Sequence, residues 1–197
     1  MTLPPGRRAL GVAESYRGRD DGATSTLCGA VVRANRAVDD AAVSRCTVGG
    51  RDATAAVVEM WSRLERPDVR YVLVAGVAPA WYNLLDLGAI ADATDRPVVA
   101  VSFEDSEGLD DAIADAFDGD ERTTRLDAYR SLPERRRIEI DGRPLFVREI
   151  GLGDRTDAVL DAYTHERRPE PLRVAKLFAR RVDAAGREGR LPPDRRD

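Results

Sequence analysis

Acidic side chains near the ends of predicted strands and helices are the first residues whose chemistry follows from their type and spacing. Glu14 shares one face of the strand predicted over 9–16 with Leu10 and Val12. A carboxylate beside apolar strand residues is rarely buried without a partner. Glu14 is therefore a candidate metal ligand or general base. The alternatives are a strand end that turns into solvent and a pair with an arginine.

Asp52, Asn83 and Asp86 stand at predicted helix starts, where capping and function compete as interpretations. Asp52 follows the glycine pair 49–50 and precedes a segment with helical apolar periodicity, so N-capping explains it without any chemistry. Asn83 and Asp86 are three residues apart, which is close to the spacing of a capping box. Both also border the loop after the central predicted strand, so the two roles are compatible there.

The stretch 69–86, VRYVLVAGVAPAWYNLLD, organises the predicted fold. It opens with a run that suits a strand buried on both faces, followed by a loop containing Gly76 and Pro79. Ligands of open α/β sheets bind beyond the carboxyl ends of such strands, so we expect any site in this loop. Trp81 and Tyr82 could stack on a nucleic-acid base there. Packing against the next helix and a homodimer interface are the alternatives for both rings.

The elements that must position these residues follow from periodicity and turn signals. Short connections join three predicted strands, which indicates an antiparallel meander over 9–16, 23–33 and 41–48. Alternating helices and strands come next, over 52–66, 69–75, 83–94 and 97–103. Further helices are predicted over 109–117, 120–132, 154–163 and 171–185, with a hairpin over 137–150 around Asp141 and Gly142. This is the outline of a ribonuclease H-like mixed α/β sheet, although other mixed folds share it. Strand 9–16 should lie parallel beside strand 69–75.

Composition narrows the class of protein. The chain has 197 residues and a formal net charge of −4, which argues against binding polyanions over the whole surface. An arginine triplet at 135–137 and arginine pairs at 167–168 and 180–181 are candidates for phosphate contacts, or for solvated and paired surface charges. Two cysteines and one histidine cannot supply a zinc site alone. Lys176 is the only lysine, and we expect it on a helix surface.

Domain organisation and location are predicted from what the sequence lacks. No repeat or low-complexity linker interrupts it, so residues 1–197 are predicted to form a single domain, with a loose arm over 1–7 and a disordered tail over 186–197. No apolar run approaches the length of a membrane span, and the first residues lack the apolar core of a signal peptide. We therefore expect a cytoplasmic protein.

Four stretches together resemble an archaeal protein family related to endonuclease V, whose members are sometimes labelled endonuclease dU, an activity on deoxyuridine in DNA. They are TVGGRDAT, GVAPAWYNLLDL, RPVVAVSFED and PEPLRVAKLFAR, and the resemblance covers residues 8–182. Two departures stand out. Where the family pattern places metal aspartates at the ends of the first and central strands, this chain has Ala13 and Ala75. Glu14 is adjacent to the first gap, but neighbouring strand residues point to opposite faces.

The resemblance implies an endonuclease V-like fold and a cation site. Mg²⁺ or Mn²⁺ would be held by Glu14 and Asp52, with Asp86 as a further catalytic residue. Trp81, Tyr82 and Asn83 would form the pocket for a deaminated base in DNA. The first hypothesis is thus a metal-dependent endonuclease acting on deoxyuridine. The second is a catalytically silent binder of a nucleotide or nucleic acid, and the third is a homodimeric interaction protein that buries its aromatic loop.

Overall fold

The antiparallel meander predicted for the start of the chain forms one side of a larger mixed sheet. The computed structural model describes residues 3–19 and 23–190. Its strands are β1 Arg8–Ser15, β2 Thr24–Arg33, β3 Val38–Thr47, β4 Val69–Ala75, β5 Val98–Ser102, β6 Arg136–Ile140 and β7 Arg143–Ile150. They form one seven-stranded sheet in the order β3-β2-β1-β4-β5-β7-β6. β1, β4 and β5 run parallel to one another, and the other pairings are antiparallel.

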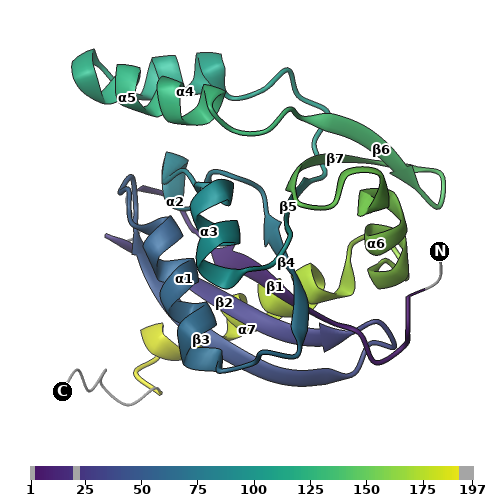
Figure 1. The fold of residues 1–197 in the computed structure, drawn as a ribbon. Helices are drawn as coiled ribbons and strands as arrows, with labels where there is room; N and C mark the ends of the chain where they lie inside the picture. Colours follow the sequence, from purple (N-terminus) through teal and green to yellow (C-terminus); the bar gives the residue numbers. More distant parts are fainter. Residues whose placement is uncertain (1–2, 20–22, 191–197) are drawn as a thin grey trace.

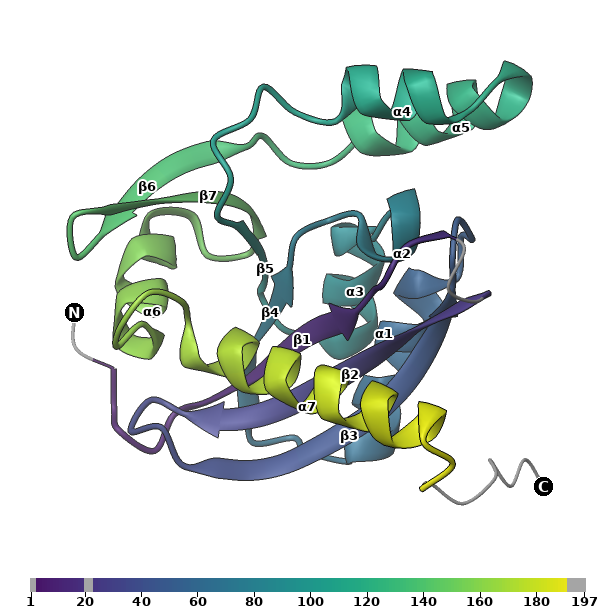
Figure 2. The same cartoon turned by 180° about the vertical axis from the view of Figure 1, so that it is seen from behind.

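Helices cover both faces of this sheet. The helices of the described residues are α1 Ala53–Leu64, α2 Pro79–Tyr82, α3 Leu87–Thr94, α4 Asp110–Ala116, α5 Gly119–Arg130, α6 Thr156–Tyr163 and α7 Glu170–Arg187, with a 3-10 turn η2 at Gly153–Arg155; α4 and α5 pack on each other away from the sheet (Figure 1). α1 and α3 lie on one face (Figure 1), and α7 crosses the opposite face over β1 and β2 (Figure 2). None of the helices in the described part of the chain combines the length and hydropathy that a bilayer span needs.

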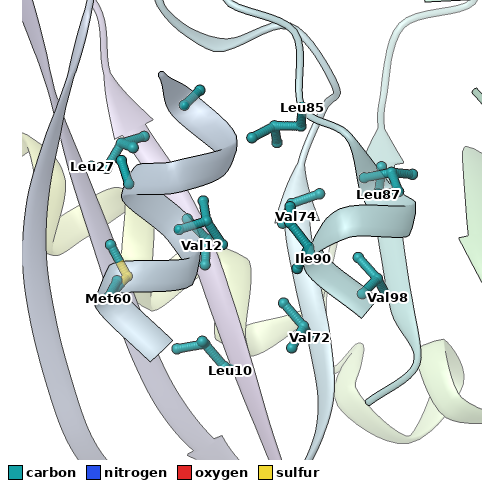
Figure 3. Packing of buried hydrophobic residues seen from close by; sticks show 14 of the residues in the cluster. Leu10, Val12, Leu27, Met60, Val72, Val74, Leu85, Leu87, Ile90 and Val98 are labelled. Atoms are coloured by element: carbon teal, nitrogen blue, oxygen red, sulfur yellow. The ribbon is translucent and has the colours of Figure 1, made fainter. Parts of the chain in front are cut away.

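The parallel pairing of β1 with β4 confirms the predicted placement of these two strands. Val12 lies opposite Val74, so both strands point towards the loop over 76–86. Side chains from the two strands meet α1 and α3 in one core cluster, which Figure 3 shows around Leu10, Met60 and Ile90. All three are fully buried. Burial of each such side chain contributes about 1.5–3 kcal/mol, so this core fixes the strand ends that carry the loop.

On the opposite face, α7 begins in direct contact with the backbone of β1. A Cβ atom added at Gly11 would lie 2.2 Å from the backbone carbonyl carbon of Pro171. Only glycine therefore allows this approach. Ala13, on the same face of β1, packs with Val174 and Ala175 of α7. The close contact brings the next turn of α7, with Lys176, to the carboxyl end of β1.

Several segments differ from their sequence predictions. α3 begins at Leu87 rather than at residue 83, because Asp86, not Asn83, is its N-cap. Within the arm expected over 1–7, Leu3 is buried and the Pro5 carbonyl accepts a hydrogen bond from the Asn35 amide, so residues 3–7 pack against the sheet. α7 continues to Arg187, two residues beyond its predicted end, and the last seven residues of the predicted tail lie outside the described residues.

Candidate functional site

A cavity of about 420 Å³ opens beyond the carboxyl ends of β4 and β5. The loop after β4 supplies Gly76 and Ala78 to its wall, and Tyr82 follows from α2. The other walls come from the segment after β5, from α5, from β7 and from α7. This is the sheet edge at which open α/β folds bind ligands.

Aromatic rings and cationic side chains alternate around the cavity. The rings are Tyr82, Phe103, Tyr129 and Phe146, and the cations are Arg135, Arg148, Arg168 and Lys176. The guanidinium of Arg168 lies 4.3 Å from the centre of the Phe103 ring, and that of Arg135 lies 4.1 Å from the Phe146 ring. Among the described residues of the wall, Glu104 supplies the one carboxylate. The cavity therefore suits an anionic ligand that also carries a flat or apolar part.

Lys176 belongs to α7 and lines the cavity. From the sequence we expected this side chain on the surface of the helix. Its Nζ donates a hydrogen bond of 2.6 Å to the backbone carbonyl of Glu14, at the end of β1. Burial lowers the pKa of the Lys176 ammonium; the nearby Glu14 carboxylate opposes that effect, whereas Arg180 and Arg168 add to it. A cation thus occupies the end of β1, where the resemblance implied metal-binding acids.

Glu14 neither turns into solvent nor pairs with an arginine. Its Oε2 accepts a hydrogen bond of 2.9 Å from the Ser25 hydroxyl and one of 2.7 Å from the Ala80 amide. Burial raises the pKa of this carboxyl group, while the Ala80 amide, the Ser25 hydroxyl and Lys176 act in the opposite direction. The geometry gives Glu14 a positioning role, because its acceptor atom holds the first residue of the turn that carries Tyr82.

That turn is strained. Ala80, Trp81 and Tyr82 have positive φ values of 48°, 58° and 59°, although none of them is glycine. Left-handed backbone costs roughly 1–2 kcal/mol for each such residue. Arg125, which is 3% exposed, holds the other end of the turn by donating to the Tyr82 carbonyl and to the carbonyls of Gly49 and Gly50. The half-buried Glu14 and the buried Arg125 therefore fix the backbone of the turn from which Tyr82 lines the cavity.

Asn83 and Asp52 form a closed polar network under the loop. The Asn83 side chain is fully buried; it accepts from the Ala53 amide and donates to the Thr47 carbonyl and to Asp52, the last at 2.6 Å. Asp52 also accepts from the Thr47 amide and hydroxyl. Burial would raise the pKa of Asp52, but the hydrogen bonds from Thr47 and Asn83 lower it below its ordinary value. The Asn83 side chain is therefore closed off from any ligand, whereas the exposed Asp52 carboxylate is held in place by the network.

Asp86 and Trp81 lie apart from the cavity wall. Asp86 accepts a hydrogen bond of 2.9 Å from the Ala89 amide, as an N-cap does. Trp81 packs against Phe117, with ring centres 4.7 Å apart, and the Arg19 guanidinium lies 3.9 Å from the centre of its ring. Of the two adjacent aromatic residues, only Tyr82 lines the cavity.

The side chains present do not fit a divalent cation held by the protein. A hard cation needs several oxygen ligands. Glu14 and Asp52 each accept hydrogen bonds from protein donors, and Ala13 and Ala75 offer no side-chain oxygen. Within residues 3–19 and 23–190, no three His, Cys, Asp or Glu side chains gather as a metal site. Roles of Glu14, Asp52 and Asp86 in metal binding or catalysis stay predictions.

Sequence reasoning missed two parts of this site. Arg125 is one charged residue among many on a predicted surface helix, with nothing to mark it as buried. Tyr129, Phe146, Arg148 and Lys176 come from three separate elements, and only the fold brings them together. The arginine runs at 135–137 and 167–168 did mark two of the cationic side chains of the wall, Arg135 and Arg168.

The sheet and its flanking helices define a ribonuclease H-like fold of the endonuclease V kind. Human ENDOV superposes with a TM-score of 0.63 at 16% identity, covering 92% of this chain and 86% of that chain. Endonuclease V of Ciona intestinalis, solved with a 24mer DNA containing an inosine, gives 0.56 at 14% identity, with 93% and 88% covered. A protein of unknown function from Archaeoglobus fulgidus reaches 0.78 at 20% identity, with 89% and 98% covered.

Sequence comparison identifies the family within this fold. The endonuclease dU family profile matches residues 5–183. A UPF0215 protein of Pyrobaculum calidifontis is 35% identical over 176 residues, which cover 86% of this chain and 93% of that relative. The chain belongs to the endonuclease dU family, as its sequence resemblance indicated.

Proposed function

We propose that this endonuclease dU family member binds nucleic acid and holds one displaced nucleotide in the cavity beyond β4 and β5. The observation that carries the proposal is the alternation of aromatic rings and cations around a volume of about 420 Å³. Ligand pockets of small molecules begin near this size, roughly 300 Å³. A displaced nucleotide has both features that such a wall recognises, a flat base and a phosphate.

Tyr82 is the ring best placed to stack on the base. It lines the cavity and stands on a turn whose backbone is fixed by Glu14 and Arg125. Stacking on an aromatic side chain contributes about 1–3 kcal/mol per base. A ring on a fixed turn loses little conformational freedom on binding, so more of that free energy appears as affinity.

Arg168, Lys176 and Arg180 are suited to the phosphates on either side of the displaced nucleotide. Arg168 and Lys176 line the cavity, and Arg180 follows Lys176 by four residues, on the same side of α7. Phosphate contacts position a strand without reading its sequence, and they make affinity depend on salt. The Ciona intestinalis endonuclease V with bound DNA lends support from the same fold.

Metal-dependent cleavage of deoxyuridine DNA is the second candidate function. The family match over residues 5–183 favours it, and the carboxylate arrangement around Glu14 and Asp52 does not. Cleavage with Mg²⁺ or Mn²⁺ would require further oxygen ligands to gather around one ion, or the nucleic acid to supply most of the ligands.

One experiment separates the two functions. Fluorescein-labelled oligonucleotides carrying deoxyuridine, deoxyinosine or a tetrahydrofuran residue are titrated with the protein in EDTA over a salt series, and cleavage is then scored with Mg²⁺ or Mn²⁺. We expect binding that persists in EDTA and weakens as salt rises. Cleavage that needs the metal would establish the second function instead. If no oligonucleotide binds at any salt concentration, nucleic-acid recognition is wrong.

A further inference from the structure

One border of the cavity is strongly acidic. Residues 104–121 contain nine carboxylate side chains and no lysine, arginine or histidine, and the first part of this segment lies in the cavity wall. Of the nine acids, Asp110, Asp118 and Glu121 form ion pairs. The other six are exposed and form no ion pair with the residues that the structure describes: Glu104, Asp105, Glu107, Asp111, Asp115 and Asp120. We call residues 104–121 the acidic rim.

A second border of the same cavity is basic. Its wall includes Arg168 and Lys176, and Arg180 lies one helical turn beyond Lys176 on α7. Arg167 and Arg180 are exposed and have no carboxylate partner among the described residues. We call these four side chains the basic rim. Figure 2 shows α7 across one face of the sheet, whereas α4 and α5, which carry much of the acidic rim, lie away from it. The two rims therefore border the cavity with opposite charge.

Arg135 holds the start of the acidic rim at the cavity. Its guanidinium donates hydrogen bonds of 2.6 Å and 2.7 Å to the backbone carbonyls of Glu104 and Ser106. These bonds fix the backbone and leave the carboxylates of the rim in solvent. Arg148, the other arginine of this wall, likewise donates to a backbone carbonyl and to a tyrosine hydroxyl. The negative charge is thus a fixed part of the cavity border.

We propose that the cavity takes its nucleotide from a single strand or a single-stranded gap and rejects continuous duplex. The inference rests on the proposed function, because it concerns the form of nucleic acid that reaches the cavity. A duplex has two phosphate backbones, with about one negative charge per 1.7 Å of its axis. One backbone can lie along the basic rim. The other would then approach the acidic rim, where like charges repel.

A single strand avoids this repulsion. It presents one backbone, which the basic rim neutralises, and its bases are free to enter the cavity without a pairing partner. Salt screens charges on the surface over about 10 Å at 0.1 M. Rising salt should therefore weaken all binding through the basic rim and, at the same time, reduce the preference for single strands that the acidic rim creates.

Three forms of one fluorescein-labelled DNA strand with a single deoxyuridine test the proposal. The strand is used alone, annealed to a complement that leaves a gap opposite the deoxyuridine, and annealed to a full complement with thymidine opposite it. The mismatch makes the deoxyuridine easy to displace but keeps both backbones. Binding to the full-length protein is measured by anisotropy in EDTA over a salt series. We expect the single strand and the gapped form to bind at least about tenfold more tightly than the mismatched duplex at low salt.

A pair of matched variants tests the acidic rim itself. The rim variant removes three exposed charges, none of them on a described residue that lines the cavity: Asp105→Asn, Glu107→Gln and Asp111→Asn. The control variant makes the same three kinds of change at exposed positions outside the rim and the cavity wall: Asp92→Asn, Glu65→Gln and Asp161→Asn. Both raise the net charge equally. The rim variant should tighten duplex binding by about fivefold relative to single-strand binding, and the control should leave that ratio unchanged.

The outcomes separate this inference from the function on which it rests. A preference for the single strand and the gapped form that shrinks in the rim variant and with salt supports the proposal. Equal affinity for the gapped form and the mismatched duplex, or the same ratio in the rim and control variants, overturns it and leaves nucleic-acid binding intact. If circular dichroism shows that the rim variant is unfolded, the comparison of the three DNA forms with the parent protein decides. Protein that binds none of them overturns both.

Discussion

The Glu14 carboxylate and the Ala80 amide, 66 residues apart in the chain, are joined by a hydrogen bond of 2.7 Å. Glu14 stands at the end of β1, and Ala80 is the first of three left-handed residues that end with Tyr82. The bond therefore ties the shape of the aromatic loop to the sheet. An acidic side chain at the expected metal edge holds protein backbone in this structure.

Substitutions of Glu14 test this role. Glu14→Ala removes the acceptor of a largely buried amide and should lower the free energy of unfolding by about 1–3 kcal/mol. Glu14→Gln keeps an acceptor and should cost less. Because burial raises the Glu14 pKa above 4.5, stability tied to this group is present at low pH and is lost as the pH rises through the folded-state pKa. Urea titrations should therefore find Glu14→Gln gaining stability relative to the parent above about pH 4.5. A constant difference across that range would contradict the assignment.

Tyr82→Ala and Trp81→Ala form a matched pair for the cavity. Tyr82 lines it, whereas Trp81 packs against Phe117 outside it. Tyr82→Ala should weaken binding of a displaced nucleotide by about 1–3 kcal/mol, the usual contribution of one stacking ring. Trp81→Ala should lower the melting temperature but change affinity much less. Fluorescence anisotropy at fixed salt measures affinity, and a larger loss for Trp81→Ala would favour the sequence-based assignment of Trp81 to the base.

Arg125→Lys should be far from conservative. The guanidinium donates to three backbone carbonyls and also pairs with Glu121, an arrangement that one ammonium cannot reproduce. Breaking a buried charge network of this kind costs about 3 kcal/mol, measured by denaturant unfolding. Arg130→Lys, at an exposed position of the same helix, is the control and should change stability by about 0.5 kcal/mol or less. Equal effects of the two substitutions would argue against a network at Arg125.

Asp39 gives the protein a pH-dependent stabilisation at the amino-terminal end of β1. Hydrogen bonds from Arg33 and Arg8 outweigh burial and lower the pKa of Asp39 from 3.8 to about 2. A depressed carboxyl pKa stabilises the fold above the unfolded-state value and is lost as the pH falls through the folded one. Asp39→Asn should therefore destabilise by about 1 kcal/mol at neutral pH. The gap between parent and variant should close between about pH 4 and pH 2 in thermal melts, and a gap that persists at pH 2 would contradict this.

Local signals predicted the fold better than they predicted the site. The meander, the pairing of β1 with β4 and the hairpin at Asp141 and Gly142 follow from alternation, short connections and turn residues. Both hairpin residues have the positive φ that this two-residue turn demands. The spacing of Asn83 and Asp86 was misleading, because Asp86 caps the helix itself and frees Asn83 for a buried network.

The cavity wall depends on contacts that no local pattern encodes. Tyr129, Phe146 and Lys176 are far apart in the chain and meet only because α5, β7 and α7 converge at one sheet edge. Trp81 and Tyr82 are neighbours in the chain, and no local pattern distinguishes their roles. Both lie in the left-handed turn, yet only the Tyr82 ring lines the cavity. The sequence shows that both rings are present. The strained turn that gives them different surroundings is held by Glu14 and Arg125, which lie far from it in the chain.

The missing side chain of Gly11 has an evolutionary consequence. Because a Cβ atom there would collide with the backbone of Pro171, any larger residue would lift the start of α7 away from β1. Lys176 lies five positions further along the same helix, and its amine would then be withdrawn from the end of β1. Among relatives, positions 11 and 176 should therefore change together. A lineage that loses glycine at the first should no longer be under selection to keep lysine at the second.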